Sequence, residues 1–417
     1  MATSLIGFTD RDRPSDAVIR SCVHCGFCLP TCPTYRLTGR ERSSPRGRIR
    51  LMRAVSEGEL SVLDPIFEEE MALCLNCRAC EAVCPSGVQY GQILEASRAQ
   101  IEQHRSPAMP ERAARAATFG LLFTDMRRFR LASRALRLYE RSGLQGLARR
   151  TGVLRLLHLE ETERLAPAVS ETFTVPVGQT YAAQGRRRGR VGLLTGCIMS
   201  TAYAEVHEAT IRVLTRNGFD VTLVADQGCC GALHVHGGDP DGGRELARRN
   251  IDAFDNPRLD AVIVNAAGCG AALKEYGHLL KDDPDYAERA EAFSARVKDA
   301  IEFLADVGLT AAPGRLPVTV TYQEPCHLAH AQRITWQPRA LLGAIPGLEL
   351  REMPESSLCC GSAGIYNITQ PEMSAQLLER KLDNALSTGA EVIVSANPGC
   401  MLQIAAGLRS RGDDRPV

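Results

Sequence analysis

The 417-residue sequence predicts an α + α/β protein, in which a helical N-terminal module and a helical linker precede two repeated α/β half-domains. Three observations lead to this prediction. Sixteen cysteines fall into three separate groups, of eight, four and four. Residues between the first two groups carry apolar side chains at helical spacing, whereas residues after 190 alternate between short apolar runs and helical patterns. The last two cysteine groups also repeat one another in spacing.

The composition excludes several classes of protein. Hydrophobic residues make up 44% and charged residues 24%, which is typical of a globular protein rather than a disordered one. The N-terminal residues are polar, with no apolar run that would indicate a secretory signal. The longest uncharged run, 392–408, contains Asn397, Pro398 and Gln403 and is not typical of a membrane span. Without a visible secretory signal, we expect a cytosolic chain whose cysteines bind metal rather than form disulfides.

The first cysteine group, within the predicted domain 1–100, consists of two copies of one motif. CVHCGFCLPTCP and CLNCRACEAVCP both have the C-x2-C-x2-C-x3-C-P spacing of bacterial ferredoxins. Two-residue spacers let the backbone wrap one face of a cubane, while the fourth cysteine of each motif binds the other cluster. We therefore expect two 4Fe–4S clusters: cluster 1 on Cys22, Cys25, Cys28 and Cys84, and cluster 2 on Cys74, Cys77, Cys80 and Cys32.

Two further features of this module bear on the prediction. Residues 33–73 between the motifs are longer than in a compact ferredoxin and have helical patterns, which indicates a helical variant of the two-cluster module. A pair of zinc sites is the alternative, but zinc usually takes two C-x2-C pairs rather than a triple followed by Cys-Pro. His24 is expected to be a spacer. Arg46, Arg48 and Arg50 are expected either to raise the potential of a nearby cluster or to be solvated.

The second region, 101–190, is predicted to be a helical linker. RAARAATFGLLFTDMRRFRLASRALRLYERSGLQGLARR has apolar residues at three- and four-residue spacing with arginines between them, and a Pro/Gly-containing stretch follows. Residues 1–190 carry 29 Lys and Arg against 20 Asp and Glu. This excess is compatible with a membrane surface, an acidic partner or simply solvated helices. Nucleic acid is not expected, because stacking aromatics are not interleaved with the basic residues.

The remaining chain is predicted to form two related α/β half-domains, 191–310 and 311–417, each with a small parallel sheet. From the first cysteine to the cysteine pair is 32 residues in one half and 33 in the other. From the pair to the last cysteine is 39 residues against 40. Agreement in both intervals indicates a true internal repeat.

Each half contains a C…CCG…C pattern that could gather four thiols at one site. Adjacent cysteines on an extended strand point to opposite faces, so the pair converges only if the chain turns there, and Gly231 and Gly361 allow such a turn. Packing of small buried cysteines is the alternative to a metal or redox role. Five histidines nearby are candidate proton carriers: His207, His234, His236, His327 and His330. The two candidate sets are Cys197, Cys229, Cys230 and Cys269, and Cys326, Cys359, Cys360 and Cys400.

Several segments together resemble the iron–sulfur subunit of bacterial glycolate oxidase (glycolate dehydrogenase). They are CVHCGFCLPTCPTYRLTGRERSSPRGRI, CLNCRACEAVCPSGVQY, GCCGALHVH, GCGAALKEYG, CHLAHAQ and LCCGSAG. The wider group with cysteine-rich CCG domains includes a heterodisulfide reductase component, the anaerobic glycerol-3-phosphate dehydrogenase small subunit and lactate-utilisation proteins. The full CCG motif of heterodisulfide reductase ends in CxxC, whereas this chain has Ala272 and Gln403 at the last position. That departure leaves open whether the CCG halves bind metal.

The resemblance implies an electron-transfer subunit of an oxidoreductase complex that converts glycolate to glyoxylate. FAD is expected on a flavoprotein partner, because no strand-borne G-x-G-x-x-G is present here, and no complete glycolate site is expected in this chain. The electron acceptor would be a quinone or another acceptor, and the location cytoplasmic or peripheral on the cytoplasmic face of the inner membrane. Alternatives are a related complex acting on lactate, glycerol 3-phosphate or a disulfide, a CCG half that itself reduces a disulfide or quinone, and a zinc-stapled scaffold.

Overall fold

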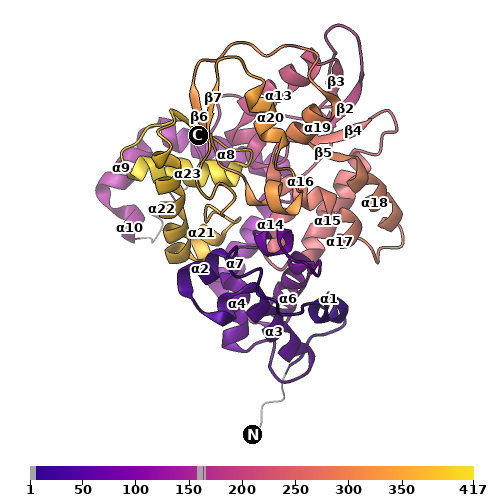
Figure 1. Cartoon of the computed structure of the whole chain (residues 1–417), viewed down its shortest axis with the longest axis vertical. Coiled ribbons are helices and arrows are strands. Elements are labelled where there is room, and N and C mark those ends of the chain that lie inside the picture. The colour runs from indigo at the N-terminus through magenta and orange to yellow at the C-terminus, as the bar shows by residue number, and fades with distance from the viewer. Residues whose placement is uncertain (1–5, 157–162, 164–165) are drawn as a thin grey trace.

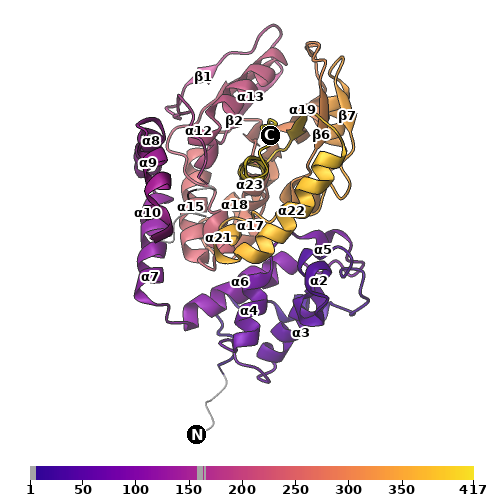
Figure 2. The same cartoon turned by 90° about the vertical axis from the view of Figure 1, so that its left-hand side faces the viewer.

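The computed structural model describes residues 6–156, 163 and 166–417. The N-terminal module lies at one end of the molecule, beneath both α/β repeats (Figure 1). The linker helices stand as a column along one side of the first repeat (Figure 2). The predicted fold class, a helical two-cluster module followed by a linker and two α/β repeats, is confirmed. The exact domain boundaries at 100, 190 and 310 stay predictions.

The N-terminal module is entirely helical among the residues described there. Helix α3 begins where the Ser44 hydroxyl accepts the backbone N–H of Gly47, and α4 begins where the Asp64 carboxylate accepts that of Ile66. Fully buried Met52, Phe67 and other apolar side chains from α3, α4 and α6 form its core. The elements are α1 (Asp16–Arg20), α2 (Pro33–Thr38), the 3-10 turn η1 (Glu41–Ser43), α3 (Pro45–Ser56), α4 (Pro65–Leu73), α5 (Ala79–Ala82) and α6 (Tyr90–His104).

The linker continues as helices that pack on the first repeat by a few apolar side chains. Met126 and Phe129 are buried in the core of the first repeat, and the ring of Phe119 lies 5.2 Å from that of His234. The elements are α7 (Met109–Arg115), the π-helical segment η2 (Ala116–Leu122), α8 (Met126–Arg141), α9 (Leu144–Thr151) and α10 (Val153–Leu156). Within the described part of the chain, no helix has both the length and the apolar character needed to cross a bilayer.

The first repeat is built on a five-stranded sheet with the order β1-β3-β2-β4-β5. All neighbouring strands are parallel except β1, which pairs antiparallel with β3. Along β4, alternate residues enter different cores: Val262 and Val264 face one and Ala261 and Ile263 the other, as the period of a strand requires. The strands are β1 (Thr180–Tyr181), β2 (Gly189–Leu193), β3 (Phe219–Thr222), β4 (Ala261–Val264) and β5 (Val297–Asp299).

Helices cover both faces of this sheet. The helices that follow β4 carry the last cysteine of the first set, because α16 begins at Ala267 and includes Cys269. The helices are α12 (Ile198–Ala202), α13 (Ala204–Arg216), α14 (Ala232–His236), α15 (Pro240–Ala253), α16 (Ala267–Lys274), α17 (Tyr276–Leu279), α18 (Ala287–Arg296) and α19 (Ala300–Val307).

The second repeat has a three-stranded parallel sheet with the order β7-β6-β8. Its helices include the long α22, which follows the cysteine pair, and α23, which carries Cys400 near its start. The elements are β6 (Thr319–Tyr322), the π-helical segment η3 (His327–Ala331), α20 (Gln337–Gly343), β7 (Glu349–Arg351), α21 (Tyr366–Thr369), α22 (Pro371–Ser387), β8 (Val392–Val394) and α23 (Pro398–Ser410).

The two repeats share one topology. In each, the first strand lies in the middle, flanked by the second and the third: β3-β2-β4 in one repeat and β7-β6-β8 in the other. The loops after these strands carry the cysteines, so both sets gather at the carboxyl ends of the strands. The first sheet differs from the predicted parallel sheet, because β1 and β5 extend it and β1 pairs antiparallel with β3. Cys269 and Cys400 both lie in the first turn of a helix.

Candidate metal centres

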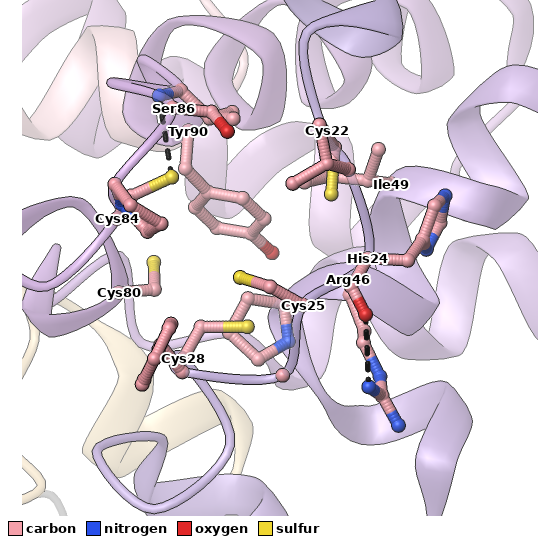
Figure 3. Close-up of a pocket in the computed structure, with 16 residues that line it drawn as sticks. Cys22, His24, Cys25, Cys28, Arg46, Ile49, Cys80, Cys84, Ser86 and Tyr90 are labelled. Carbon is pink, nitrogen blue, oxygen red and sulfur yellow. Dashed lines mark hydrogen bonds between the residues drawn. The ribbon is translucent and has the colours of Figure 1, made fainter.

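The first hollow in the N-terminal module is surrounded by sulfur atoms from both ferredoxin motifs. Cys22, Cys25 and Cys28 line it from the first motif and Cys84 from the second, with Cys80 also at its wall (Figure 3). This grouping is the crossed one that the spacing predicts. The hollow lies at the surface, because Cys25 is exposed and the neighbouring Phe27 side chain is 64% exposed.

Local backbone geometry aims N–H groups at these sulfurs. His24 and Gly26 adopt positive φ angles of 55° and 88°, so the loop between the first cysteines curls around the hollow. Burial raises the pKa of the Cys22 and Cys28 thiols, and the backbone N–H groups of His24 and Arg46 act against it. On the other motif, the Val88 N–H lies 3.5 Å from the Cys84 sulfur. Such bonds stabilise thiolates that bind metal.

The second hollow is buried and lined by Cys32, Cys74, Cys77 and Cys80. It therefore also combines three cysteines of one motif with the fourth of the other. Tyr90 lines both hollows, and its hydroxyl donates to the Cys74 sulfur over 3.6 Å. The Cys32 sulfur lies 3.3 Å from the Thr34 hydroxyl. The two hollows are adjacent, because Pro45 and Cys80 also line both.

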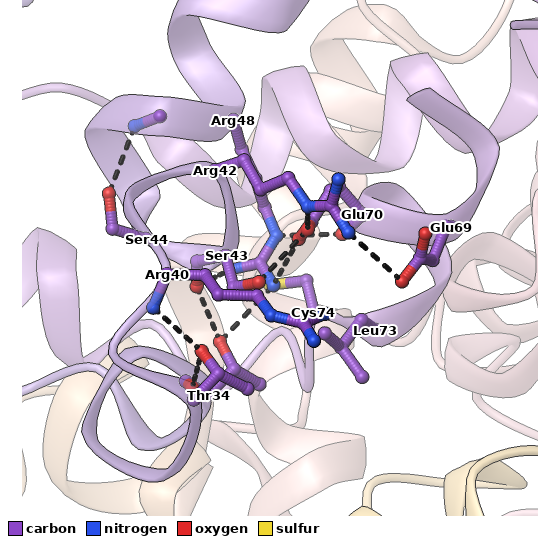
Figure 4. Close-up of polar contacts among 12 residues, drawn as sticks. Thr34, Arg40, Arg42, Ser43, Ser44, Arg48, Glu69, Glu70, Leu73 and Cys74 are labelled. Atoms are coloured by element: carbon purple, nitrogen blue, oxygen red, sulfur yellow. Dashed lines mark hydrogen bonds and ion pairs between the residues drawn. The ribbon is translucent and has the colours of Figure 1, made fainter. Parts of the chain in front are cut away.

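Arg48 is a fully buried cation at the wall of the second hollow (Figure 4). Its guanidinium donates to the backbone oxygens of Glu70 (2.7 Å) and Ser43 (2.8 Å) and to the Thr34 hydroxyl (3.1 Å). It also pairs with the Glu70 carboxylate at 3.4 Å. Of the three arginines singled out in the sequence, Arg48 is the buried one, while Arg50 is about half exposed.

Burial keeps the thiols of the second hollow protonated unless a positive charge compensates their thiolates. It raises the pKa of Cys77 and of Cys80 well above the ordinary value. Burial opposes the charge of Arg48, but Cys74, Tyr90 and Cys32 outweigh it and raise its pKa. Four sulfurs and a fixed cation around a buried hollow fit an iron–sulfur cluster bound by thiolates.

A single metal ion fits these residues less well. Among the described residues, no three cysteine, histidine or carboxylate side chains converge as the ligands of one ion do. Four zinc-bound thiolates would surround one point at about 2.3 Å. The C-x2-C-x2-C-x3-C-P spacing, together with the lining of each hollow by cysteines of both motifs, favours the iron–sulfur interpretation over the zinc alternative.

Glu95 on α6 joins the second hollow to the repeats. Its largely buried carboxylate, 13% exposed, accepts hydrogen bonds from the Asn76 amide (2.7 Å) and from His236 (2.9 Å), and pairs with Arg78 at 3.2 Å. Arg78 also pairs with Glu275 of the first repeat. Burial opposes the charge of Glu95, but His236 and Arg78 outweigh it and lower its pKa. Asn76 and Arg78 flank Cys77, so this network holds a cysteine-bearing loop.

The four thiols of each repeat form a chain of contacts in the same order. In the first repeat, the Cys197 and Cys229 sulfurs are 3.8 Å apart, and the pKa values of Cys229 and Cys230, and of Cys230 and Cys269, depend on one another. The second repeat has the matching interactions between thiols: Cys326 with Cys359, Cys359 with Cys360, and Cys360 with Cys400. All eight predicted cysteines are thus brought together in two sets of four.

The turn that the cysteine pairs require is present in both repeats. Gly231 and Gly361 have φ angles of 79° and 87°, the left-handed region that favours glycine. A Cβ atom at Gly361 would lie 2.6 Å from the Ser374 backbone oxygen, so a side chain there would clash. Hydrogen bonds from neighbouring thiols lower the pKa of Cys229 and of Cys360 well below the ordinary value.

The histidines near these sets are mainly structural. Ring nitrogens of His207, His234, His327 and His330 donate to the backbone oxygens of Thr195, Phe119, Asn76 and Ser357, respectively. Burial lowers the pKa of His207 to about 4 and that of His327 to about 3, so both are neutral near pH 7. A proton-carrying role is therefore not favoured for these two residues. The bond from His327 to Asn76 ties the second repeat to the loop that carries Cys77.

Sequence reasoning missed several polar residues around the thiols. The Asn397 amide donates to the Cys400 sulfur (3.4 Å) and accepts the Gly268 N–H (3.1 Å), so it links the two repeats beside both last cysteines. Lys381 is buried behind the second cysteine pair. Asn397 lies in a loop and Lys381 in a helix, and neither belongs to a sequence motif. The only sequence signal for Lys381 is a lysine at a position that the helical pattern of 371–387 places on the buried face.

Comparison with known families matches every part of this architecture. Residues 18–88 match a 4Fe-4S dicluster domain, and residues 191–274 and 320–405 each match a cysteine-rich domain. Residues 110–166 match the linker region of the glycolate oxidase iron-sulfur subunit. The linker match decides between this family and other proteins with CCG domains, because the linker is not part of the shared cysteine motifs.

The names of similar proteins indicate the same family. The chain is 44% identical to the probable glycolate oxidase iron-sulfur subunit of Bacillus subtilis, over 96% of this chain and 92% of the relative. It is 36% identical to the glycolate oxidase iron-sulfur subunit of Escherichia coli, over 95% and 92%. Lactate utilization protein A of Exiguobacterium is 30% identical over 53% of this chain and 91% of its own length.

The chain belongs to the glycolate oxidase iron–sulfur subunit family. Membership confirms the resemblance drawn from the motifs, and the dicluster domain confirms the expectation of 4Fe–4S clusters in the N-terminal module. The chain is an iron–sulfur electron-transfer protein, and its family consists of subunits of an oxidoreductase complex. The non-redox zinc scaffold is not favoured.

The buried ion pair at the second hollow yields a test. Replacing Arg48 with Met leaves Glu70 buried with only the half-exposed Arg42 as a charged partner. Breaking a buried pair from one side costs about 3–5 kcal/mol, so we expect Arg48→Met to lower the unfolding midpoint and to speed cluster loss. Arg50→Met, on the same helix but exposed, should change the stability by no more than about 0.5 kcal/mol.

The measurement is denaturant unfolding of the cluster-loaded protein, followed by visible absorbance. If Arg48→Met and Arg50→Met have the same unfolding midpoint and lose their clusters at the same rate, Arg48 does not support the second hollow.

Proposed function

We propose that Cys22, Cys25, Cys28 and Cys84 hold cluster 1, and that Cys74, Cys77, Cys80 and Cys32 hold cluster 2. The observation that carries this proposal is the crossed lining of the two hollows, in which each contains three cysteines of one motif and the fourth of the other. Cys80 borders both hollows, and its place after Cys77 in the motif assigns it to cluster 2. When bound, such clusters accept and release electrons one at a time.

The subunit serves glycolate oxidation in a complex, as the names of its relatives indicate. A flavoprotein partner would bind FAD and oxidise glycolate to glyoxylate, and a quinone or another acceptor would receive the electrons. This chain supplies the positioning of the thiols. The exposed loop with Val23, Cys25 and Phe27 brings the first hollow to the surface, where a partner can approach, while the second hollow is closed against the repeats.

Crossed ligation can be tested by spectroscopy of single variants. We expect about eight irons per chain in the ferredoxin-type sites of anaerobically purified protein. Cys32→Ser should alter the same EPR signal as Cys77→Ser, because both residues line the second hollow. Cys84→Ser should alter the same signal as Cys25→Ser, because both line the first. A Cys32→Ser spectrum that matches Cys25→Ser instead would refute the crossed assignment.

The division of labour between subunits leads to a second expectation. The purified chain alone should not reduce a dye with glycolate as donor, since an iron–sulfur cluster does not accept a hydride. Activity should appear when the flavoprotein partner is co-expressed and co-purified. Lactate and glycerol 3-phosphate serve as control substrates for the assembled complex. Glycolate turnover by the isolated chain would contradict the subunit assignment.

We further propose that the two cysteine sets of the repeats are additional metal or redox sites. The matching contacts of Cys197, Cys229, Cys230 and Cys269, and of Cys326, Cys359, Cys360 and Cys400, support a common task for both sets. If the thiols merely packed, Cys→Ser would cost about 1–3 kcal/mol for a buried hydroxyl and leave the metal content unchanged.

We also propose a peripheral contact between the linker helices and an anionic membrane surface on the cytoplasmic side. Residues 109–156 contain eleven arginines against three acidic residues. On α8, Leu131 and Leu138 are 66% and 67% exposed and lie two turns apart on one face, with Arg127 and Arg134 between and beside them. Exposed leucines flanked by arginines suit the boundary between lipid headgroups and acyl chains.

Vesicle sedimentation tests this contact. The full chain should sediment with vesicles of an anionic phospholipid and less with zwitterionic vesicles, and added salt should weaken the binding. Replacing both Leu131 and Leu138 with Gln should reduce binding several-fold. Leu316→Gln, at a leucine that is 51% exposed in the loop before β6, is the matched control and should bind normally. Equal binding of all three proteins would exclude the α8 face.

A further inference from the structure

The two repeats differ in charge at one equivalent position behind their cysteine pairs. The helix after each pair begins with a proline, Pro240 in α15 and Pro371 in α22. Ten residues later lies Asn250 in the first repeat and Lys381 in the second, and both side chains are fully buried. The repeats therefore place a neutral amide and an ammonium at the same point of the fold.

Asn250 holds its cysteine loop by neutral hydrogen bonds. Its side-chain oxygen accepts the Gly228 N–H (2.9 Å), and its amide donates to the Cys229 backbone oxygen (2.9 Å) and to the Tyr276 hydroxyl (3.0 Å). Tyr276 in turn donates to the Cys230 backbone oxygen (2.9 Å). All polar groups of this amide are satisfied by neutral partners, so Asn250 brings no charge to the first set.

Lys381 has a different environment. Its ammonium donates to the backbone oxygens of Glu355 (2.8 Å) and Ser356 (3.0 Å), in the loop just before the second cysteine pair. No carboxylate in the described part of the chain lies within ion-pair distance of it, because the Glu355 side chain pairs with Arg36 and Arg380 instead. Burial lowers the pKa of Lys381, and the groups that act against this are the four thiols of the second set: Cys360, Cys359, Cys400 and Cys326.

A buried ammonium without an anionic partner is costly, and two carbonyl oxygens do not neutralise it. Thiolates in the second set would supply the missing negative charge. Four thiolates on a metal centre carry a net negative charge, so a cation beside them stabilises the loaded state. The first set, with Asn250 behind it, lacks this compensation.

We propose that Lys381 is the counter-charge of a thiolate-bound iron–sulfur centre on Cys326, Cys359, Cys360 and Cys400, and that the first set binds such a centre more weakly. This inference rests on the proposal that the repeats bind metal, and adds that they do so unequally. Lys381 is thus a positioning residue: it touches the loop that presents the cysteines and acts on the centre through its charge.

Metal analysis of the full chain in its complex with the flavoprotein partner tests this proposal. Iron and acid-labile sulfide are measured per chain in the unaltered protein and in Cys230→Ser, Cys360→Ser and Lys381→Met. We expect iron beyond the eight atoms of the ferredoxin module in the unaltered protein. Cys360→Ser should remove most of this excess, Cys230→Ser should remove little, and Lys381→Met should reproduce Cys360→Ser. Lys381→Arg, which keeps the charge, should retain at least half of the excess.

Arg380→Met is the matched control. Arg380 precedes Lys381 on α22 and contacts the same loop through Glu355, but its side chain is 38% exposed and faces the surface. It should keep the excess iron. EPR signals of clusters 1 and 2, unchanged in Lys381→Met, show that the variant folds and separate this test from that of crossed ligation. If Lys381→Met fails to fold, the comparison of Lys381→Arg with Lys381→Gln decides by the same measure.

Three results would overturn the proposal: no iron beyond eight atoms in the unaltered protein, retention of the excess in both neutral variants, or a larger loss in Cys230→Ser than in Cys360→Ser. In each case the two-cluster assignment would still stand on its own EPR signals.

Discussion

The arrangement of the N-terminal module against the two repeats depends on the carboxylate of Glu95. This carboxylate is largely buried, and it binds the two residues that flank Cys77 as well as His236 of the first repeat. Through Arg78 the same network reaches Glu275 on the far side of the interface. Asn76 and Arg78 both have positive φ angles, 51° and 58°, which non-glycine residues adopt only when surrounding contacts hold them. The loop that presents Cys77 is therefore shaped by the interface with the repeats.

This dependence makes the second hollow part of the interface as well as part of the N-terminal module. Cys77 packs in one apolar cluster with Cys359, and Cys326 lies against the same cluster. His327, next to Cys326, donates to the Asn76 backbone oxygen, and the Tyr366 hydroxyl donates to the oxygen of Leu73, next to Cys74. Two hydrogen bonds thus join the loops of the second hollow to the second repeat. The cysteines of the first repeat lie in a separate core with no cysteine of the N-terminal module.

Much of this could be predicted from sequence, because metal-binding spacing and internal repeats are local or periodic signals. The C-x2-C-x2-C-x3-C-P motifs predicted the grouping of Cys32 with Cys74 and of Cys84 with Cys22, and the intervals between cysteines predicted two α/β units of one topology. The Glu95 network could not be foreseen, since Arg78 and Glu275 are 197 residues apart and each member is an ordinary polar residue in its own segment. Strand β5 was missed for a similar reason: VKD has no apolar run of its own and is a strand because β4 pairs with it.

Burial of charge explains how the repeats can share a fold and yet differ in chemistry. Duplication preserves topology easily, because parallel strands and their covering helices depend on apolar spacing that many substitutions satisfy. A buried polar position is different, since each side chain there must find partners for all its polar atoms. Asn250 finds them in the backbone and in Tyr276. The Lys381 ammonium donates to two carbonyl oxygens, and the thiols of the second set act on it only through charge. A single change from amide to ammonium thus ties the stability of the second repeat to the charge on its cysteines. The second set is also the one that lies beside Cys77, so the repeat with the buried cation is the repeat that adjoins the second hollow.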